Sequence, residues 1–215
     1  MDLLIENKLS KYKTHIIDYA SLKSILVNMD YENINDKIAN LKQKGIIKSI
    51  KKGFYIHTSL INKNIVSKEF LSNNLLDGPS YISLDYALYF YGLIPEAVYE
   101  ITAITTKRSK VFKTDIGVFS YKHIKKELFS IGIKTESLKN GNCLIASKEK
   151  AICDKIYFTK GIELSSKSSL IEFIENDLRI DIDEFENFNI NIFAEYYKVS
   201  KSKKIQILLN LIKEL

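Results

Sequence analysis

Two short helical patterns followed by two β-rich runs occupy residues 18 to 56, and this order constrains the fold more than any other feature of the chain. Asp18 is placed to cap the first helix, and apolar residues then recur three and four positions apart. The inward positions of the two helices are Leu22, Ile25, Leu26, Ile34, Ile38 and Leu41. The runs 46 to 50 and 54 to 56 flank a Lys-Lys-Gly turn, which predicts a small hairpin. This order is typical of a helix-turn-helix followed by a β wing.

The rest of the chain mixes helical and strand patterns, and we expect a boundary near residue 60. A connecting helix is expected between 57 and 78. Further helices are predicted at 84 to 91, 148 to 158, 169 to 178 and 201 to 215, capped in three cases by Ser83, Ser147 and Ser200, and strands at 99 to 106, 111 to 114, 118 to 121 and 143 to 146. In the helix after Ser147, the spacing of Ala151, Ile152, Lys155 and Ile156 predicts that these residues face a sheet. The predicted fold class is α+β, with a winged helix-turn-helix at 1–60 and a mixed α/β C-terminal domain at 61–215.

The formal charge of +6 is unevenly distributed. Residues 1 to 60 carry ten lysines against six acidic residues, whereas residues 163 to 186 carry two basic against eight acidic residues. This distribution indicates a polyanion on one surface and a different, basic partner on another, although a high content of Lys and Asn is also typical of proteins encoded by AT-rich genomes. The acidic run comprises Asp177, Asp181, Asp183, Glu184 and Glu186. It lacks the spacing of a calcium loop, so we interpret it as solvated surface or a site for a basic protein.

The second helix of the N-terminal pattern carries polar residues away from its apolar face. A helix about 10 to 12 Å across fits a major groove roughly 12 Å wide, where Asn recognises adenine and Lys contacts guanine or phosphate. The candidate DNA contacts from the residues themselves are Asn33, Lys37, Asn40, Lys44, Lys51 and Lys52. The alternative is that these side chains are the solvated side of an ordinary helix and hairpin.

Catalytic patterns are weak in this chain. His15, His57 and His123 are far apart, neither Cys143 nor Cys153 lies in a nucleophile motif, and no glycine-rich phosphate loop occurs. We therefore expect no catalytic residue, no metal and no cofactor. A metal-dependent nuclease using scattered carboxylates, or an interaction module without DNA binding, are the alternatives. No apolar run is long enough for a membrane span and no export signal is evident, so a cytoplasmic protein without a membrane partner is expected.

Four passages, spread in order over residues 18 to 158, resemble the abortive-infection AbiEi antitoxin family. They are KIANLKQKGIIKSIKKGFYI, SYISLDYALYFYGLIPEAVYEITAITTKRSKVFKT, GVFSYKHIKKELF and LIASKEKAICDKIYF. The chain departs from the family at Lys148, where proline is common, and proline there favours only the first helical turn. The residues after about 160 have no match.

The resemblance implies a transcriptional autoregulator of a type IV toxin-antitoxin, phage-defence system. Its winged helix would bind inverted repeats of double-stranded DNA in its own promoter, and its C-terminal domain would counter a nucleotidyltransferase-like toxin without a tight complex. The matching wing segment adds Lys48 to the expected DNA contacts.

A second basic cluster follows in the C-terminal part: Lys107, Arg108, Lys110, Lys113, Lys122, Lys125 and Lys126. Lysines at strand edges commonly prevent aggregation. The alternative interpretation is a secondary phosphate contact or a toxin-facing patch.

Overall fold

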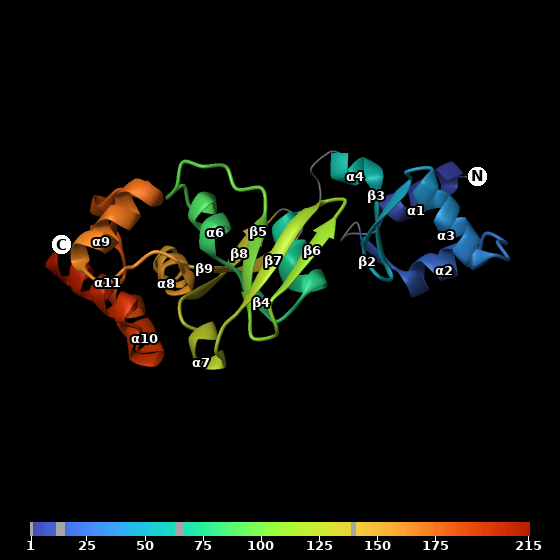
Figure 1. The fold of residues 1–215 in the computed structure, drawn as a ribbon. Coiled ribbons are helices and arrows are strands. Elements are labelled where there is room, and N and C mark those ends of the chain that lie inside the picture. Colours follow the sequence, from blue (N-terminus) through green and yellow to red (C-terminus); the bar gives the residue numbers. More distant parts are fainter. Residues whose placement is uncertain (1, 12–15, 63–66, 139–140) are drawn as a thin grey trace.

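The computed structural model describes residues 2–11, 16–62, 67–138 and 141–215, which form a mixed α+β structure with eleven α-helices and two sheets. The chain is arranged along one axis (Figure 1). The N-terminal elements lie at one end, the larger sheet lies in the middle, and the C-terminal helices lie at the other end. Within the described ranges, no helix combines the length and apolar character needed to cross a bilayer.

The N-terminal part contains the predicted pair of helices and the predicted hairpin. Its elements are α1 (Asp2–Ser10), β1 (Ile16–Asp18), α2 (Tyr19–Val27), α3 (Ile34–Gln43), β2 (Ile47–Lys51) and β3 (Phe54–His57). The strands form an antiparallel sheet in the order β1-β3-β2. Asp18 caps α2 as expected, because its carboxylate accepts from the backbone N–H of Ser21 at 2.9 Å. Hydrogen bonds from the backbone N–H and the hydroxyl of Ser21 hold the pKa of Asp18 below its ordinary value.

The two faces of this small sheet bury different neighbours. Ile17 and Ile47 belong to a core formed with α1, α2 and α3. Ile16, Ile50 and Ile56 instead belong to the larger core of the C-terminal part. The sheet is therefore a shared wall between the two parts, which the sequence pattern did not indicate.

The chain then crosses to the second sheet through α4 (Thr58–Asn62), α5 (Lys68–Leu71) and a π-helical turn at Ser72–Leu76. The expected connecting helix thus forms as short pieces, and part of it, 63–66, lies outside the described residues. The strands are β4 (Ser80–Ile82), β5 (Ile101–Thr105), β6 (Lys110–Thr114), β7 (Gly117–His123), β8 (Ile133–Leu138) and β9 (Gly141–Ala146), in the order β6-β7-β5-β4-β9-β8. The pairs β4–β9 and β5–β7 are parallel, and the other pairs are antiparallel.

Helices cover both faces of this sheet. On one face, Tyr121 of β7 donates to the backbone carbonyl of Ser72 in the π-helical turn at 2.9 Å. On the other face, Tyr81 of β4 reaches helix α8. The helices not yet named are α6 (Leu84–Phe90), α7 (Lys126–Phe129), α8 (Lys148–Phe158), α9 (Lys167–Glu172), α10 (Ile190–Ser200) and α11 (Lys203–Glu214). The last two pack against α8 on the side away from the sheet.

Three local expectations are corrected by the structure. Ser147 caps α8 as expected, and Ser83 occupies the N-cap position of α6 as expected, but its hydroxyl donates to Asp154 and makes no capping bond. Ser200 ends α10, and Ser202 occupies the N-cap position of α11. Helix α8 is also buried on more than one side, because it lies between the sheet and α10 and α11. The sheet-facing set expected there is therefore incomplete, and Lys155 is only half-buried.

Candidate nucleic-acid interface

Tyr19, the first residue of α2, connects the turn of the hairpin to α3. Its backbone N–H donates to the carbonyl of Gly53 at 2.7 Å, and its hydroxyl donates to the side-chain oxygen of Asn35 at 2.9 Å. Gly53 has φ +80, a conformation that glycine adopts without steric cost, so the chain can reverse directly after Lys52. The hairpin turn, the start of α2 and the start of α3 are therefore held together.

An open groove runs beside Tyr19, between α2 and the first turn of α3. Lys23, Asn33 and Asn35 line it and are exposed. Glu32 and Asp36 line it too, so the groove holds two carboxylates and one lysine. Asp36 in the first turn of α3 is favourable for the helix dipole, but it weakens the attraction of this surface for a polyanion.

The predicted contacts on α3 share one flank of the helix. Asn33, Lys37, Asn40 and Lys44 follow each other at three- and four-residue spacing. Asn33 occupies the N-cap position without a side-chain capping bond, and Lys44 occupies the C-cap position. The ammonium of Lys37 lies 4.7 Å from the ring centroid of Tyr31.

A second flank of α3, the one bonded to Tyr19, was not anticipated. Asn35 and Lys42 are both exposed and lie seven residues apart, so they point to the same side of the helix, with Ala39 exposed beside them. The only sequence signal for this flank was helical spacing, and that signal does not tell which polar side faces the hairpin. Only the hydrogen bond from Tyr19 makes this distinction.

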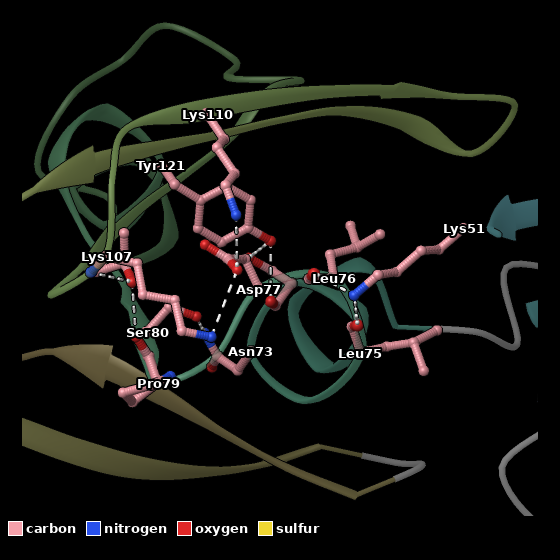
Figure 2. Close-up of polar contacts among 12 residues, drawn as sticks. Lys51, Asn73, Leu75, Leu76, Asp77, Pro79, Ser80, Lys107, Lys110 and Tyr121 are labelled. Atoms are coloured by element: carbon pink, nitrogen blue, oxygen red, sulfur yellow. Dashed lines mark hydrogen bonds and ion pairs between the residues drawn. The ribbon is translucent and has the colours of Figure 1, made fainter.

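Lys48 and Lys51 point away from this groove. Lys48 pairs with Ile56, on the sheet face that contributes to the larger core, and is half-buried. The ammonium of Lys51 donates to the carbonyls of Leu76 at 3.0 Å and Leu75 at 3.3 Å (Figure 2). Carbonyls at a helix end lack partners in the helix, so Lys51 caps the π-helical turn. Of the three expected wing lysines, Lys52 alone is exposed at the turn with no bond to another described group.

Asp77 directly follows that turn and engages part of the second basic cluster. Its Oδ1 lies 3.5 Å from the ammonium of Lys110 and 3.8 Å from that of Lys107 (Figure 2). Its Oδ2 is buried and has no hydrogen-bond partner among the described residues. These two lysines therefore balance a buried carboxylate on the face of the sheet that carries the π-helical turn.

The other members of that cluster lie elsewhere. Lys110 is paired with Tyr121, whereas Lys122 is the next residue along β7 and points to the opposite face, as does Lys113. Arg108 precedes β6, and Lys125 and Lys126 lie at the start of α7. All of these side chains are exposed, but the cluster is divided between the two faces of the sheet and does not form one patch.

A buried polar network in the C-terminal part was also not predicted from the sequence. Asp154 of α8 is fully buried, and its Oδ2 accepts from the hydroxyls of Ser83 at 2.8 Å and Tyr81 at 3.0 Å. Its Oδ1 accepts from the hydroxyl of Tyr196 at 2.8 Å and lies 3.6 Å from the ammonium of Lys150. Burial raises the pKa of Asp154, and Lys150 and the three hydroxyls oppose this rise.

Lys150 is the cation of this network and is also fully buried. It donates to the carbonyl of Leu128 at 2.9 Å, and its ammonium lies 4.8 Å and 5.0 Å from the ring centroids of Tyr81 and Tyr196. Burial lowers the pKa of Lys150, and Asp154 opposes this effect. The network joins β4, α7, α8 and α10, so its role is to hold the core together.

The remaining polar candidates are dispersed. The acidic run lies around a 3-10 turn at Ile182–Asn187, where Asp181 caps the backbone N–H of Asp183. His57 lies 3.6 Å from Glu6, and His15 lies outside the described residues. In the described part of the chain, no three His, Cys, Asp or Glu side chains gather in an arrangement that would hold a metal.

The groove beside Tyr19 is thus the surface that best combines exposed lysine and asparagine side chains with a helix start and a hairpin turn. In comparisons with known proteins, no family model matched the chain and no curated protein matched it.

Proposed function

We propose that this protein is a DNA-binding transcriptional regulator whose N-terminal part acts as a winged helix-turn-helix. The observation that carries the proposal is the pair of bonds from Tyr19 to Gly53 and Asn35, since they hold the hairpin turn next to the first turn of α3. A recognition helix inserts its first turns into the major groove, and neighbouring elements grip the backbone.

In this arrangement Lys23 of α2 and Lys52 of the hairpin turn neutralise DNA phosphates on either side of the major groove. Asn33 and Asn35 project from the start of α3. The amide of Asn33 makes paired hydrogen bonds with adenine in this proposal, whereas Asn35, whose Oδ1 accepts from Tyr19, contributes its Nδ2 as a donor. Lys37, Asn40 and Lys44 lie on the flank away from Tyr19, and we assign them a smaller share of the binding. Lys48 and Lys51 stabilise the junction between the two parts of the molecule.

The cellular role that we propose rests on the resemblance to the AbiEi antitoxins. The chain would act in the cytoplasm, repress its own operon through inverted repeats in the promoter, and counter a nucleotidyltransferase-like toxin through its C-terminal part. The quoted passages correspond to α3 through β3, β4 through β6, β7 with α7, and β9 with α8. They thus include most of α3, the hairpin and every strand of the central sheet except β8, whereas Lys23, Asn33 and Asn35 lie before the first passage.

The test is a fluorescence-anisotropy titration of the protein with its upstream DNA at several salt concentrations. Each lost phosphate contact reduces the slope of log K against log salt by about 0.9, so Lys23→Ala with Lys52→Ala should flatten it by about 1.8. The matched comparison is Lys37→Ala with Lys44→Ala, which removes the same charge from the same module. We expect this second pair to change the slope less.

An exposed lysine at the far end of the molecule, Lys198 on α10, provides the outer control. Lys198→Ala should leave both affinity and slope unchanged. If the wild-type protein fails to bind its upstream DNA, or if the Lys23 and Lys52 pair leaves the slope unaltered, the proposed interface is wrong.

A further inference from the structure

A cleft of about 790 Å³ lies in the C-terminal part, far from the groove beside Tyr19. Its walls come from the start of α6, the end of β7, the end of α8 with the loop that follows it, and the π-helical turn after α9. Small-molecule sites usually occupy about 300 to 1,000 Å³, so this cleft has the size of a ligand site.

Positive charge predominates in the cleft. Lys122, Lys155 and Lys160 line it, together with a single carboxylate, that of Asp85. Lys155 forms an ion pair with this carboxylate, which balances both charges. Lys122 and Lys160 have no acidic partner among the described residues, so the cleft is complementary to an anion.

A histidine contributes an acceptor to the cleft. Nδ1 of His123 lies 3.0 Å from the carbonyl oxygen of Lys107. A carbonyl oxygen only accepts, so Nδ1 carries the proton in this contact, and Nε2 of the neutral ring is an acceptor that suits a hydroxyl or amino group of a ligand. Lys122 and His123 are consecutive residues at the end of β7, where they line the same cleft.

Part of the cleft lining is apolar. The ring centroid of Phe158 lies 5.6 Å from the ammonium of Lys122, and Ile162, which also lines the cleft, is 43% exposed. An aromatic surface next to uncompensated lysines suits a ligand that has both a planar ring and phosphates. A free inorganic anion would use only the lysines and would leave this apolar wall uncovered.

The walls are fixed before any ligand arrives. The ion pair between Lys155 and Asp85 joins α8 to α6. The carbonyl of Thr159 accepts from Lys204 of α11 at 2.6 Å, and the hydroxyl of Thr159 donates to the carbonyl of Lys155 at 2.7 Å. A site that is already formed avoids the cost of ordering its walls on binding.

We infer that this cleft binds a nucleoside phosphate, with its phosphates on Lys122 and Lys160 and its base against Phe158 and Ile162. This inference is independent of the proposed DNA binding, since the two surfaces share no residue.

Isothermal titration calorimetry of the full chain, without DNA, tests the inference with ATP, GTP, CTP and UTP as probes. The controls are tripolyphosphate, which lacks a base, and adenosine, which lacks phosphate. At least one nucleotide should bind saturably at one site and more tightly than either control. A charge-assisted hydrogen bond is worth enough for Lys122→Ala and Lys160→Ala each to weaken binding about tenfold or more. Lys198→Ala should have no effect.

A measurement on the wild-type protein removes dependence on the variants. Backbone amide signals in two-dimensional NMR should shift at residues 122–123 and 158–162 when the nucleotide is added. The inference is overturned if no nucleotide binds at millimolar concentration, if tripolyphosphate binds as tightly as the nucleotide, or if the shifts occur elsewhere.

Discussion

Removal of the buried carboxylate of Asp154 should destabilise the protein severely. In Asp154→Ala the hydroxyls of Tyr81, Ser83 and Tyr196 lose their acceptor, and each unsatisfied buried group costs about 1 to 3 kcal/mol. The ammonium of Lys150 is left in the core without its counter-ion, and a broken buried pair costs roughly 3 to 5 kcal/mol. These costs overlap because the groups share one cavity, so we expect a loss of about 5 kcal/mol.

This loss is comparable to the whole stability of many domains, about 5 to 15 kcal/mol. The assay is urea unfolding followed by circular dichroism, since the chain has no tryptophan. Glu195→Ala, an exposed carboxylate on α10, is the matched control and should change the stability by less than about 0.5 kcal/mol.

A double variant separates the ion pair from the packing. Lys150→Met with Asp154→Leu removes both charges and keeps most of the volume, so it should be more stable than Asp154→Ala. The three hydroxyls still lack their acceptor and the carbonyl of Leu128 loses its donor in this variant, which limits the recovery. A loss below about 1 kcal/mol for Asp154→Ala, or a double variant no more stable than the single one, would refute the reasoning.

Two further outcomes follow from other parts of the chain. Asp18→Ala should remove the cap of α2 and cost about 1 kcal/mol at neutral pH. The pKa of Asp18 in the folded protein lies below its ordinary value of 3.8, so the cap stabilises the fold above that pH and its contribution is lost as the pH falls through the folded pKa. Urea midpoints of wild type and variant should therefore converge in acid, and a constant difference would contradict the capping role. Burial raises the pKa of the Cys143 thiol to about 12 and that of Cys153 well above its ordinary value. Neither thiol should react quickly with a disulfide reagent until the protein is unfolded, and a fast-reacting thiol at neutral pH would show that the core around them opens.

The elements predicted correctly from sequence are those whose pattern is local. In the helices α2, α3 and α8, apolar residues recur at helical spacing and the capping residues lie within a few positions. Strands β6 and β7 are joined by a short turn. The unpredicted strands β1, β4 and β8 are short or weakly patterned, and their partners determine their identity. Strand β4, for example, pairs with β9, which lies some sixty residues further along the chain.

The candidate site was predicted in part for the same physical reason. Helical spacing identified polar residues on α3, but only tertiary contacts determine which flank faces the hairpin. Lys51 could not be placed from sequence, because its partners are main-chain carbonyls twenty-four and twenty-five residues away. The network around Asp154 was missed because charged residues in a helix normally indicate a solvent-exposed face, whereas α8 is covered on both sides.

The attachment of Lys51 to the main chain of residues 75 and 76 has a geometric consequence. A hairpin anchored in this way cannot rotate relative to the C-terminal part, because any rotation must first break the hydrogen bonds of the Lys51 ammonium and separate Ile50 and Ile56 from the larger core. Under the proposed DNA binding, two copies of the chain on a palindrome would have a fixed distance between their α3 helices, and an operator with the wrong number of base pairs between its half-sites would engage only one copy.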